Sequence, residues 1–285
     1  MPEGDTIFRS ARALNRALAG KVVTAFRSTY PLLKRFHEDT PLTSQTVTEV
    51  ESRGKWLLIH FSGGATLTTH MLMNGSWHIY RPGQRWQAPS NAARIVIENA
   101  DYLAVGFNVP VAEIHTPESL ARNRRIPPPA SDLLRPDFNA DAAIERILAQ
   151  AGEELGTVLL HQRVLAGIGN VFKSEICFVA RLNPFQAINT LSRGQIVEII
   201  AIAKRQLSAN VLEDSREKIV TWRGAGRRTT NNSDPTESLW VYGREDQPCR
   251  LCNALIRARK QGTDARITFW CPQCQPMPDG RNIDG

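Results

Sequence analysis

The sequence predicts an α+β protein with several domains, and three observations support this fold class. Apolar residues recur at helical spacing in residues 5–20 and again from residue 137 to about residue 216. Residues 21–116 instead contain short β-type runs separated by glycine turns. Two Cys-x-x-Cys pairs near the C-terminus enclose a segment with the pattern of a β-hairpin. A chain of 285 residues has room for two or three compact domains.

The N-terminal part of the chain is predicted to form a helix followed by a β-rich domain. Asp5 is the expected N-cap of a helix over residues 5–20, and Gly20 is its expected stop signal. The apolar stripe of this helix consists of Ile7, Ala11, Leu14 and Leu18. The β-type runs that follow are residues 22–23, 47–50, 56–61, 67–73, 77–80, 94–97 and 102–107. Several short strands with turns between them predict a β-sandwich or a barrel.

The middle of the chain is predicted to be helical and to follow a stiff, basic linker. Three arginines and three consecutive prolines mark residues 121–136 as a domain boundary. The helices beyond it are expected at residues 142–151, 158–164, 170–180, and from the N-cap Ser192 to about residue 212. Two glycines in residues 165–170 precede the third helix, where free backbone N–H groups can bind phosphate. An ordinary tight turn between two helices is the alternative for this segment.

These changes of pattern divide the chain into five segments. The expected boundaries are 1–120 for an N-terminal domain, 121–136 for the linker, 137–246 for a helical domain, 247–276 for a Cys-rich finger and 277–285 for a tail. Within the helical domain, residues 221–237 are polar, contain glycine and carry several arginines, so they are predicted to form a mobile loop.

Four of the five cysteines form the strongest local signal in the chain. Each Cys-x-x-Cys knuckle directs two thiolates at one ion, and four thiolates complete the closed shell of a structural zinc site. Redox chemistry is the alternative, but neither pair opens a helix in a βαβ pattern. We therefore predict one structural Zn²⁺ bound by Cys249, Cys252, Cys271 and Cys274. The fifth cysteine, Cys177, lies in an apolar helix and is expected to be buried.

The residues between the two Cys pairs predict a basic hairpin. Strands are expected at residues 254–259 and 266–270 around a turn at 261–264. Four cations decorate this hairpin, namely Arg257, Arg259, Lys260 and Arg266. The whole chain has a formal net charge of +7, which favours a polyanionic partner such as nucleic acid over an ordinary basic surface. The hairpin is therefore predicted to contact DNA.

The sequence contains no apolar run long enough for a membrane span or a signal peptide. We accordingly expect a cytoplasmic protein that does not bind a membrane. The reducing conditions of that compartment also favour metal-bound or free thiols over disulfides.

The second residue is a candidate nucleophile. Removal of Met1 would leave Pro2 as a free secondary amine beside the carboxylate of Glu3. A neutral amine can attack the C1′ carbon of a sugar, and the adduct of a secondary amine is an iminium with no N–H proton to lose. Glu3 is placed to move protons around such an adduct. The alternative is that Pro2 only signals the removal of Met1.

Five stretches of the sequence, taken in order, match one known family. They are Pro2-Glu3-Gly4, Ser-Arg-Gly-Lys-Trp-Leu at residues 52–57, His-Met-Leu-Met-Asn-Gly at 70–75, Gly-Ile-Gly-Asn-Val at 167–171, and the segment 249–274 with Arg266 five residues before Cys271. Over nearly its whole length the chain resembles the formamidopyrimidine-DNA glycosylase and endonuclease VIII family of base-excision repair enzymes. The resemblance is closest to the endonuclease VIII branch, in particular to its actinobacterial forms.

The resemblance implies a role for each matched residue. Pro2 corresponds to the nucleophile that attacks C1′ of the damaged nucleotide, and Glu3 corresponds to the acid/base. Lys55 corresponds to the lysine that binds the phosphate next to the lesion. Asn170 and Arg266 correspond to residues that grip the phosphates flanking the flipped nucleotide.

The resemblance also assigns a function to the loop at residues 70–75. It corresponds to the loop whose side chains fill the space that the flipped base leaves. An apolar wedge helps to hold a base out of the stack, and Leu72 and Met73 suit that task. Burial in the core of the β-domain is the alternative for both side chains.

The family resemblance further implies a fold and an activity. The implied fold is an N-terminal helix with a two-sheet β-sandwich, a helical domain with a helix–two-turns–helix motif, and a zinc hairpin. The implied activity is that of a bifunctional DNA glycosylase and AP lyase acting on damaged double-stranded DNA through a Schiff base at Pro2 and β,δ-elimination. We expect a monomer that associates with the nucleoid.

Two departures from the family pattern concern the damaged base. Formamidopyrimidine-DNA glycosylases carry an Arg-Arg-Phe loop near the end of the β-domain, where this sequence has Gly-Phe-Asn-Val-Pro-Val at residues 106–111. The segment 221–237 also differs from the lesion-capping loop of the oxoguanine enzymes. Both departures favour oxidised pyrimidines as substrates. The alternative is a protein specialised for bulky lesions or crosslinks, or a non-catalytic zinc-finger protein that binds damaged DNA.

Overall fold

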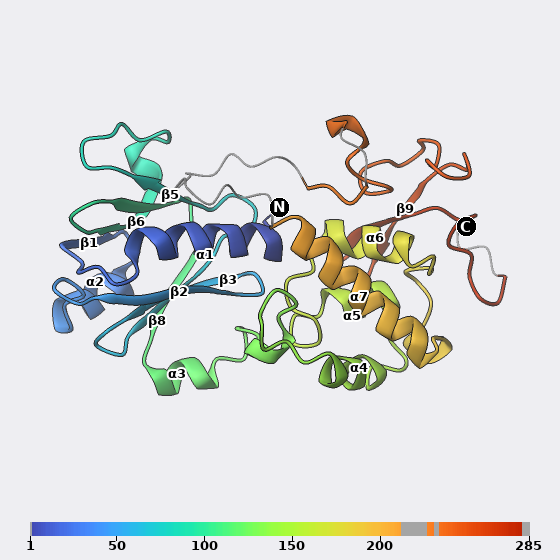
Figure 1. The fold of residues 1–285 in the computed structure, drawn as a ribbon, viewed down its shortest axis with the longest axis horizontal. Helices are drawn as coiled ribbons and strands as arrows, with labels where there is room; N and C mark the ends of the chain where they lie inside the picture. Colours follow the sequence, from blue (N-terminus) through green and yellow to red (C-terminus); the bar gives the residue numbers. More distant parts are fainter. Residues whose placement is uncertain (1, 212–226, 231–233, 281–285) are drawn as a thin grey trace. The chain divides into compact units, whose positions relative to one another are not determined.

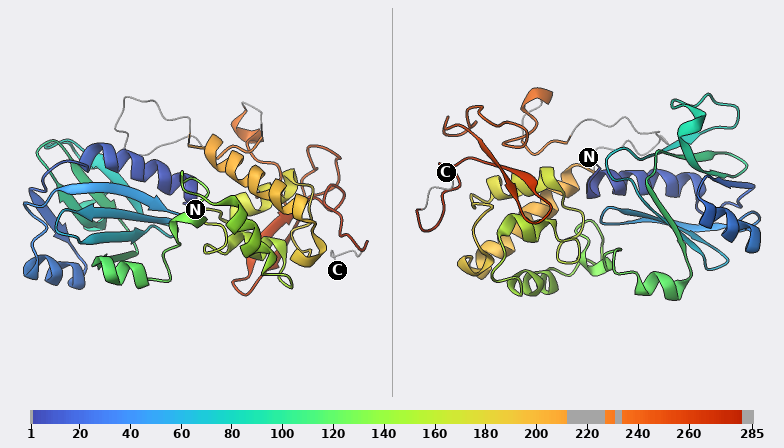
Figure 2. Two further views of the ribbon diagram at one scale, coloured as in Figure 1. Left: turned by 60° about the horizontal axis from the view of Figure 1, so that its bottom comes forward. Right: turned by 180° about the vertical axis from the view of Figure 1, so that it is seen from behind.

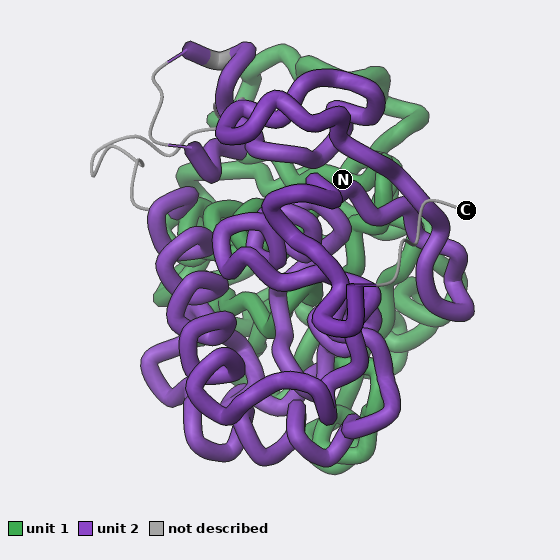
Figure 3. The backbone as a smooth tube through the Cα atoms, turned by 90° about the vertical axis from the view of Figure 1, so that its right-hand side faces the viewer, with its two compact units in different colours: residues 1–126, 214–224 green, residues 127–213, 225–285 purple. Residues whose placement is uncertain are grey.

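The computed structural model describes residues 2–211, 227–230 and 234–280 (Figure 1). The chain forms two compact units, which Figure 3 distinguishes by colour. Unit 1 comprises residues 1–126 and 214–224, and unit 2 comprises residues 127–213 and 225–285. Most of the predicted mobile loop, residues 221–226 and 231–233, lies outside the described residues, as do residues 281–285 of the predicted tail.

Unit 1 is a helix packed with two four-stranded antiparallel sheets, and Figure 2 shows these elements from two further directions. The first sheet has the order β1-β6-β7-β5 and the second has the order β2-β3-β4-β8. Helix α1 (Gly4–Leu18) contacts strands of both sheets. The strands are β1 (Ala25–Ser28), β2 (Val47–Arg53), β3 (Trp56–Phe61), β4 (Thr66–His70), β5 (Ser76–Tyr80), β6 (Ala93–Glu98), β7 (Leu103–Phe107) and β8 (Val111–His115). The predicted helix and two-sheet β-sandwich are therefore confirmed.

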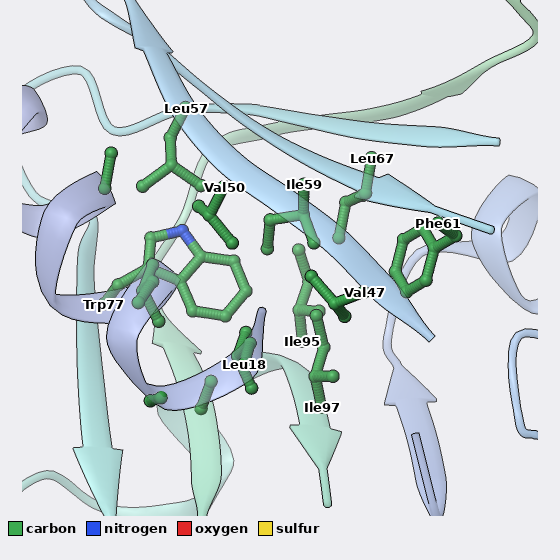
Figure 4. Close-up of a cluster of buried hydrophobic side chains, with 14 of the residues drawn as sticks. Leu18, Val47, Val50, Leu57, Ile59, Phe61, Leu67, Trp77, Ile95 and Ile97 are labelled. Carbon is green, nitrogen blue, oxygen red and sulfur yellow. The ribbon is translucent and has the colours of Figure 1, made fainter. Parts of the chain in front are cut away.

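The core of unit 1 lies between α1 and the inner faces of the two sheets (Figure 4). Strand β3 is buried along almost its whole length, in agreement with an apolar run that only His60 interrupts. Trp77 fills the centre of this core, and its indole N–H donates a hydrogen bond to Thr69 Oγ1 at 3.1 Å. The side chains labelled around it are Leu18, Val47, Val50, Leu57, Ile59, Phe61, Leu67, Ile95 and Ile97.

The start of α1 differs from the prediction. The N-cap is Glu3, whose carbonyl accepts hydrogen bonds from the backbone N–H groups of Thr6 and Ile7 at 3.0 and 3.1 Å. Asp5 is buried in the first turn, where its carboxylate pairs with Arg9 at 3.8 Å. A carboxylate at this position interacts favourably with the helix dipole without acting as the cap. The prediction of Asp5 as N-cap was therefore wrong.

Six further elements of unit 1 were missed or misplaced. The predicted run at residues 22–23 forms only an isolated bridge, and the strand begins at Ala25. Strand β8 was missed because none of its residues is fully buried and its pattern does not alternate. Strand β4 ends at His70, so the predicted run at 67–73 is too long. The short helices were also missed, namely α2 (Pro31–Asp39), α3 (Pro117–Arg122) and the 3₁₀ helix Ser90–Ala92.

Unit 2 is a helical bundle joined to a two-stranded antiparallel hairpin. Ser192 and Gln195 form the capping box at the start of α7, as the sequence predicted for Ser192. The helices are α4 (Ala140–Leu148), α5 (Leu155–Leu160), α6 (Asn170–Val179) and α7 (Arg193–Ala209), with 3₁₀ turns at Pro129–Ser131, Ile188–Thr190 and Pro235–Glu237. The hairpin consists of β9 (Arg257–Gln261) and β10 (Arg266–Trp270).

The hairpin matches its predicted second strand but not its first. Residues 254–256 close the first Cys knuckle instead of extending β9, because Cys249 N–H donates to the carbonyl of Ala254 at 2.8 Å. Strand β9 therefore starts at Arg257, and the turn moves to residues 262–265. Gly262 takes a positive φ of 67° in this turn, a conformation that glycine adopts without strain.

Two predicted helices of unit 2 begin earlier in the chain than expected. Helix α4 starts at Ala140 because Asn139 caps it, with the Ala142 backbone N–H donating to Asn139 Oδ1 at 2.9 Å. Helix α5 starts at Leu155 and ends at Leu160. Across the part of the chain that the structure describes, no helix combines the length and the apolar character needed to cross a membrane.

Candidate functional site

The N-terminal end of α1 places a buried carboxylate beside the second residue. Pro2 is partly exposed and Glu3 is fully buried. Glu3 lies at the N-terminal end of α1, toward which the first backbone N–H groups of the helix point. The dipole of α1 therefore favours a negative charge there. This arrangement gives the Glu3 carboxylate a buried position next to Pro2.

Lys55 lies at the tip of the turn between β2 and β3. Gly54 takes a φ of 60° in this turn, and the ladder closes with the pair Arg53 and Trp56. Strand β3 also pairs with β4, where Trp56 lies opposite His70. The sheet register therefore brings Lys55 to the same edge as the start of the loop at residues 70–75.

His70 is a residue of this edge whose importance the sequence did not reveal. Burial, followed by the charges of Lys55 and Arg125, lowers the pKa of His70 from 6.5 to about 4. Its ring packs edge-on against Trp56 with centroids 5.0 Å apart. Nδ1 accepts a hydrogen bond from the Leu72 backbone N–H at 3.2 Å, so the proton of the neutral ring resides on Nε2. His70 is thus a neutral hydrogen-bond donor beside a lysine.

The loop at residues 70–75 presents two large apolar side chains to solvent. Leu72 is 47% exposed and Met73 is 60% exposed, whereas Met71 is buried. The turn is closed by a hydrogen bond from Gly75 N–H to the carbonyl of Met71 at 2.8 Å. A Cβ at position 75 would lie 2.8 Å from that same oxygen, so only glycine fits. The alternative of burial in the β-domain core is therefore wrong for Leu72 and Met73.

The lowered pKa of His70 makes the stability of unit 1 depend on pH. Between pH 6.5 and about 4 the unfolded chain binds a proton at this ring and the folded chain does not. We therefore expect His70 to cause a loss of stability as the pH falls through this window. His70→Gln keeps a hydrogen-bond acceptor for Leu72 but cannot titrate. Urea unfolding at several pH values should show the wild-type protein losing stability relative to His70→Gln, and parallel curves would contradict this.

In unit 2, Asn170 connects the start of α6 to the hairpin. Gly167, with a φ of 102°, and the extended Gly169 lead into the helix. The Asn170 side chain is 8% exposed, and its Nδ2 donates to the carbonyl of Ile267 in β10 at 2.7 Å. Its Oδ1 has no hydrogen-bond partner among the described residues. The amide therefore spans the junction between the glycine turn and the hairpin.

Arg266 is exposed at the first position of β10, directly before the residue that Asn170 binds. The structure thus brings together two predicted residues that are 96 positions apart in the sequence. The exposed Arg259 and Lys260 lie on the neighbouring strand β9. This end of the hairpin is a cationic surface next to the N-terminus of a helix, which is an arrangement that binds phosphate.

Glu175 is a second residue that sequence reasoning missed. Its buried carboxylate accepts hydrogen bonds from the backbone N–H groups of three consecutive residues at 2.8–2.9 Å, and also from the Thr229 hydroxyl. Those three residues are Trp240, Val241 and Tyr242. The carboxylate thereby fixes the segment that leads into the first Cys knuckle onto α6. A charged residue within a helix whose other residues are mainly apolar was the available signal.

The four cysteines of the two knuckles converge on one point. Their Sγ atoms all lie within 4.8 Å of one another, with Cys249 and Cys274 at 3.9 Å and Cys252 and Cys271 at 3.4 Å. A tetrahedral ion with metal–sulfur bonds of about 2.3 Å requires sulfur–sulfur distances of about 3.8 Å. Burial raises the pKa of the Cys271 thiol, so a cation is needed to hold its thiolate. The cluster fits a metal ion.

The four-Cys cluster is attached to the end of α6 by two buried amides. Gln275 Oε1 accepts from the backbone N–H of Cys271 at 3.0 Å, and its Nε2 donates to the carbonyl of Leu182 at 2.9 Å. Asn183 Nδ2 donates to the Gln275 carbonyl at 2.7 Å. Cys177 lies outside the cluster in α6 and is fully buried, as predicted.

Two family models match this chain. The formamidopyrimidine-DNA glycosylase N-terminal domain matches residues 1–109, and the formamidopyrimidine-DNA glycosylase H2TH domain matches residues 130–219. The chain is 39% identical over 288 residues to the probable endonuclease 8 2 of Streptomyces coelicolor, covering 99% of this chain and 98% of that one. It is 36% identical to the DNA-(apurinic or apyrimidinic site) lyase Nei2 of Mycolicibacterium smegmatis, covering 96% and 99%.

Solved structures share the fold at lower sequence identity. The Lactococcus lactis Fpg mutant G226P, in complex with a Fapy-dG containing DNA, matches with a TM-score of 0.77 and 21% identity, covering 96% of this chain and 100% of that one. The Lactococcus lactis Fpg with an abasic site containing DNA matches with a TM-score of 0.76 and 22% identity, covering 96% and 99%. Together with the near full-length relatives, these matches confirm the resemblance predicted from the sequence, and the chain belongs to the formamidopyrimidine-DNA glycosylase and endonuclease 8 family.

Proposed function

We propose that this protein is a DNA glycosylase with AP lyase activity that removes damaged bases from double-stranded DNA in base-excision repair. The observation that carries the proposal is the pair Pro2 and Glu3 at the start of α1, in a chain whose relatives include a DNA-(apurinic or apyrimidinic site) lyase. Glu3 is buried at a helix N-terminus, where an ordinary surface glutamate has no reason to lie.

The reaction begins with Pro2 after removal of Met1. The lone pair of the secondary amine forms a bond to C1′ of the damaged nucleotide, and the bond from C1′ to the base breaks, so the base leaves with its electron pair. The amine nitrogen loses its proton, the C1′–O4′ bond of the sugar ring breaks, and O4′ takes up a proton, so that an iminium ion links the chain to the opened sugar. Glu3 moves the protons that this exchange requires, because it is the titratable group next to Pro2 in the sequence.

The iminium allows the DNA strand to be cleaved. Loss of a proton from C2′ sends an electron pair into the conjugated system and expels the 3′ phosphate. A second elimination expels the 5′ phosphate, and hydrolysis of the remaining iminium releases the amine and an unsaturated aldehyde derived from the sugar. The products are a gap of one nucleotide and the free enzyme. Each step balances without any oxidant or reductant.

Loop 70–75 and its edge of the sheet supply the groups that hold an opened duplex. Unpairing and unstacking a base costs roughly a few kcal/mol, which an apolar wedge helps to offset. Leu72 and Met73 are the exposed apolar residues of this loop. Lys55 and the Nε2–H of His70 lie at the same edge and would bind the phosphate beside the lesion.

Asn170 and Arg266 form the second phosphate grip. A phosphate oxygen accepts hydrogen bonds and donates none, so Asn170 would contact it with the Nδ2 proton that does not bind Ile267. Arg266 adds a cation at the adjacent position. Such contacts position DNA without reading its sequence, which suits an enzyme that must search for damage.

One structural Zn²⁺ is the ion that best fits the four-Cys cluster. Zinc takes four thiolates in a closed tetrahedron, and the measured sulfur–sulfur distances bracket the expected edge. When bound, the ion holds the two knuckles together and keeps their thiolates charged. The same proposal includes the predicted division of the chain, with a linker at residues 121–136 between two domains and a finger at residues 247–276. It also includes action as a monomer.

Oxidised pyrimidines are the proposed substrate class. The connection between β7 and β8 is a three-residue turn in which Val109 is buried and only Asn108 and Pro110 are exposed. It therefore offers no large side chain to fill the stack opposite a purine lesion. A protein specialised for bulky lesions or crosslinks is the second candidate, since the same turn exposes only Asn108 and Pro110.

Borohydride trapping tests the proposed function directly. The protein is incubated with duplexes that contain either an abasic site or an oxidised pyrimidine, and the iminium is reduced to a stable amine. We expect a covalent protein–DNA adduct with both duplexes and none with undamaged DNA. The absence of an adduct on both damaged duplexes would sink the lyase proposal, and trapping on the abasic site alone would exclude oxidised pyrimidines as substrates.

Arg266→Ala is expected to weaken DNA binding by roughly 10-fold at low salt, regardless of sequence. One lost phosphate contact lowers the slope of log affinity against log salt by about one. The measurement is fluorescence anisotropy with duplexes of several sequences between 50 and 300 mM salt, conditions chosen to resolve that slope. Arg193→Ala removes an exposed arginine of α7 and serves as the control. An unchanged slope in Arg266→Ala would exclude a phosphate contact at this residue.

A further inference from the structure

A continuous seam of side-chain contacts joins α6 to strand β10. Asn170 Nδ2 binds the carbonyl of Ile267, and one helical turn later Ser174 Oγ accepts from the backbone N–H of Phe269 at 3.3 Å. These two contacts occupy part of the free edge of β10, the edge that does not pair with β9. Between them lies Lys173, whose side chain is fully buried.

Lys173 begins a directional chain of hydrogen bonds through the hairpin. Its Nζ donates to Thr268 Oγ1 at 2.5 Å, and that hydroxyl donates to Gln261 Oε1 at 2.7 Å. Gln261 Nε2 then donates to Glu154 Oε2 at 2.9 Å and to the carbonyl of Pro184 at 2.8 Å. The chain has a cation at one end and a carboxylate at the other, so each bond polarises the next in the same sense.

The side-chain amide of Gln261 has a fixed position in this chain of hydrogen bonds. Both of its Nε2 protons and its Oε1 are engaged. A Cβ at Gly156 would lie 2.3 Å from Gln261 Oε1, so the amide fits only against a glycine. Gln261 is the last residue of β9, and its partner across the hairpin is Arg266. The chain therefore fixes the residue that faces Arg266.

A buried ammonium group is a costly way to support a hairpin. Burial of a charged lysine is unfavourable unless hydrogen bonds and an opposite charge compensate for the lost hydration, and an apolar side chain of similar size avoids this cost. Lysine is retained where it fixes one arrangement out of several that apolar packing would allow. Here the fixed arrangement is the register between α6 and the end of the hairpin that carries Arg266.

We propose that Lys173 is a positioning residue for Arg266: through Thr268 and Gln261 it holds the guanidinium in register with Asn170, so that the two residues bind DNA phosphate as one unit. This inference rests on the proposed function, since it requires that Arg266 contact DNA. On this inference, different groups hold the two ends of the hairpin in place. The metal centre holds the knuckle end, and the chain from Lys173 to Glu154 holds the end that contacts DNA.

Lys173→Met tests the inference because it removes the charge and keeps most of the side-chain volume. We expect this variant to reproduce the defects of Arg266→Ala, with affinity lower by roughly 10-fold at low salt and the salt slope lower by about one. In an Arg266→Ala background, Lys173→Met should have no further effect on binding, because both changes act on the same contact. Lys173→Arg, which restores a buried cationic donor, should recover most of the slope.

Three controls separate positioning from loss of structure or of charge. Lys204→Met removes an exposed lysine of α7 and should leave the slope within experimental error of the wild-type value. The metal content of Lys173→Met should equal that of the wild-type protein, because the knuckles are held separately. Thr268→Val breaks the same chain without touching the charge, so it should give the same pattern if Lys173→Met does not fold.

The outcomes distinguish the inference from the proposed function. If the wild-type protein does not bind damaged duplex DNA, the proposed function fails and this inference fails with it. If the wild-type protein binds DNA but Lys173→Met and Arg266→Ala weaken binding additively, or if Lys173→Met leaves the salt slope unchanged, the positioning role is wrong and the proposed function stands.

Discussion

Pro2→Gly is expected to abolish most borohydride trapping, by roughly 10²-fold or more, while leaving DNA binding intact. Met1 is removed before glycine as readily as before proline, so the variant still begins with an amine. That amine is primary, and its adduct with C1′ can lose an N–H proton to become a neutral imine. A neutral imine withdraws electrons from C2′ far less strongly than an iminium, so both the elimination and the reduction slow down.

The measurement compares trapped adduct and anisotropy on the same abasic-site duplex. Glu3→Gln is the companion variant, because it keeps the shape of the buried side chain and removes the acid/base. It should trap an adduct on an abasic site but lose the excision of a base. Mass spectrometry of the purified wild-type protein must show loss of Met1. Retention of Met1, or undiminished trapping by Pro2→Gly, would rule out Pro2 as the nucleophile.

Removal of the metal is expected to lower DNA affinity by at least 10²-fold. Four-thiolate sites in zinc-finger peptides contribute about 10–16 kcal/mol of apparent folding free energy. Without the ion, the buried sulfurs of Cys249 and Cys271 have no shared metal to bind. The knuckles then no longer close the base of the hairpin. Cys271→Ser should therefore release the metal and the DNA together, whereas the β-sandwich of unit 1 keeps its own core.

Cys177→Ser is the matched control for this experiment. This variant also replaces sulfur with oxygen, but at a buried cysteine that lies outside the cluster. Metal analysis should give one zinc per chain for the wild-type protein and for Cys177→Ser, and none for Cys271→Ser. Far-UV circular dichroism should show that the strands of unit 1 persist. Full DNA binding by metal-free protein would overturn the role assigned to the finger.

The elements that the sequence predicted best are those whose pattern is local. Strand β3 is an apolar run interrupted only by His60, β10 is a short β-type run directly before Cys271, and α7 begins with a Ser-x-x-Gln capping box, so each matched its expected start or its full range. Strand β8 and helix α2 have weak patterns, because they are only partly buried. Their positions depend on the neighbours that tertiary folding provides.

The residues of the candidate site also differ in whether a local sequence pattern reveals them. Pro2, Glu3 and the four cysteines could be found from short motifs, because their chemistry requires particular residue types at fixed spacing. His70 could not, since its pKa is lowered first by burial and then by the charges of Lys55 and Arg125, all of which depend on tertiary folding. Lys173 and Thr268 are 95 residues apart, and only the docking of the hairpin on α6 reveals their contact.

Helix α1 has a consequence for how the N-terminus can vary. Its C-terminal half is wedged into the core of the sandwich, so the helix cannot slide or rotate. Each residue of an α-helix advances by about 100° around the axis, because a turn contains 3.6 residues. One inserted or deleted residue ahead of Ile7 would turn the first amine to another side of the helix. The number of residues ahead of Ile7 is therefore as strictly specified as their identity.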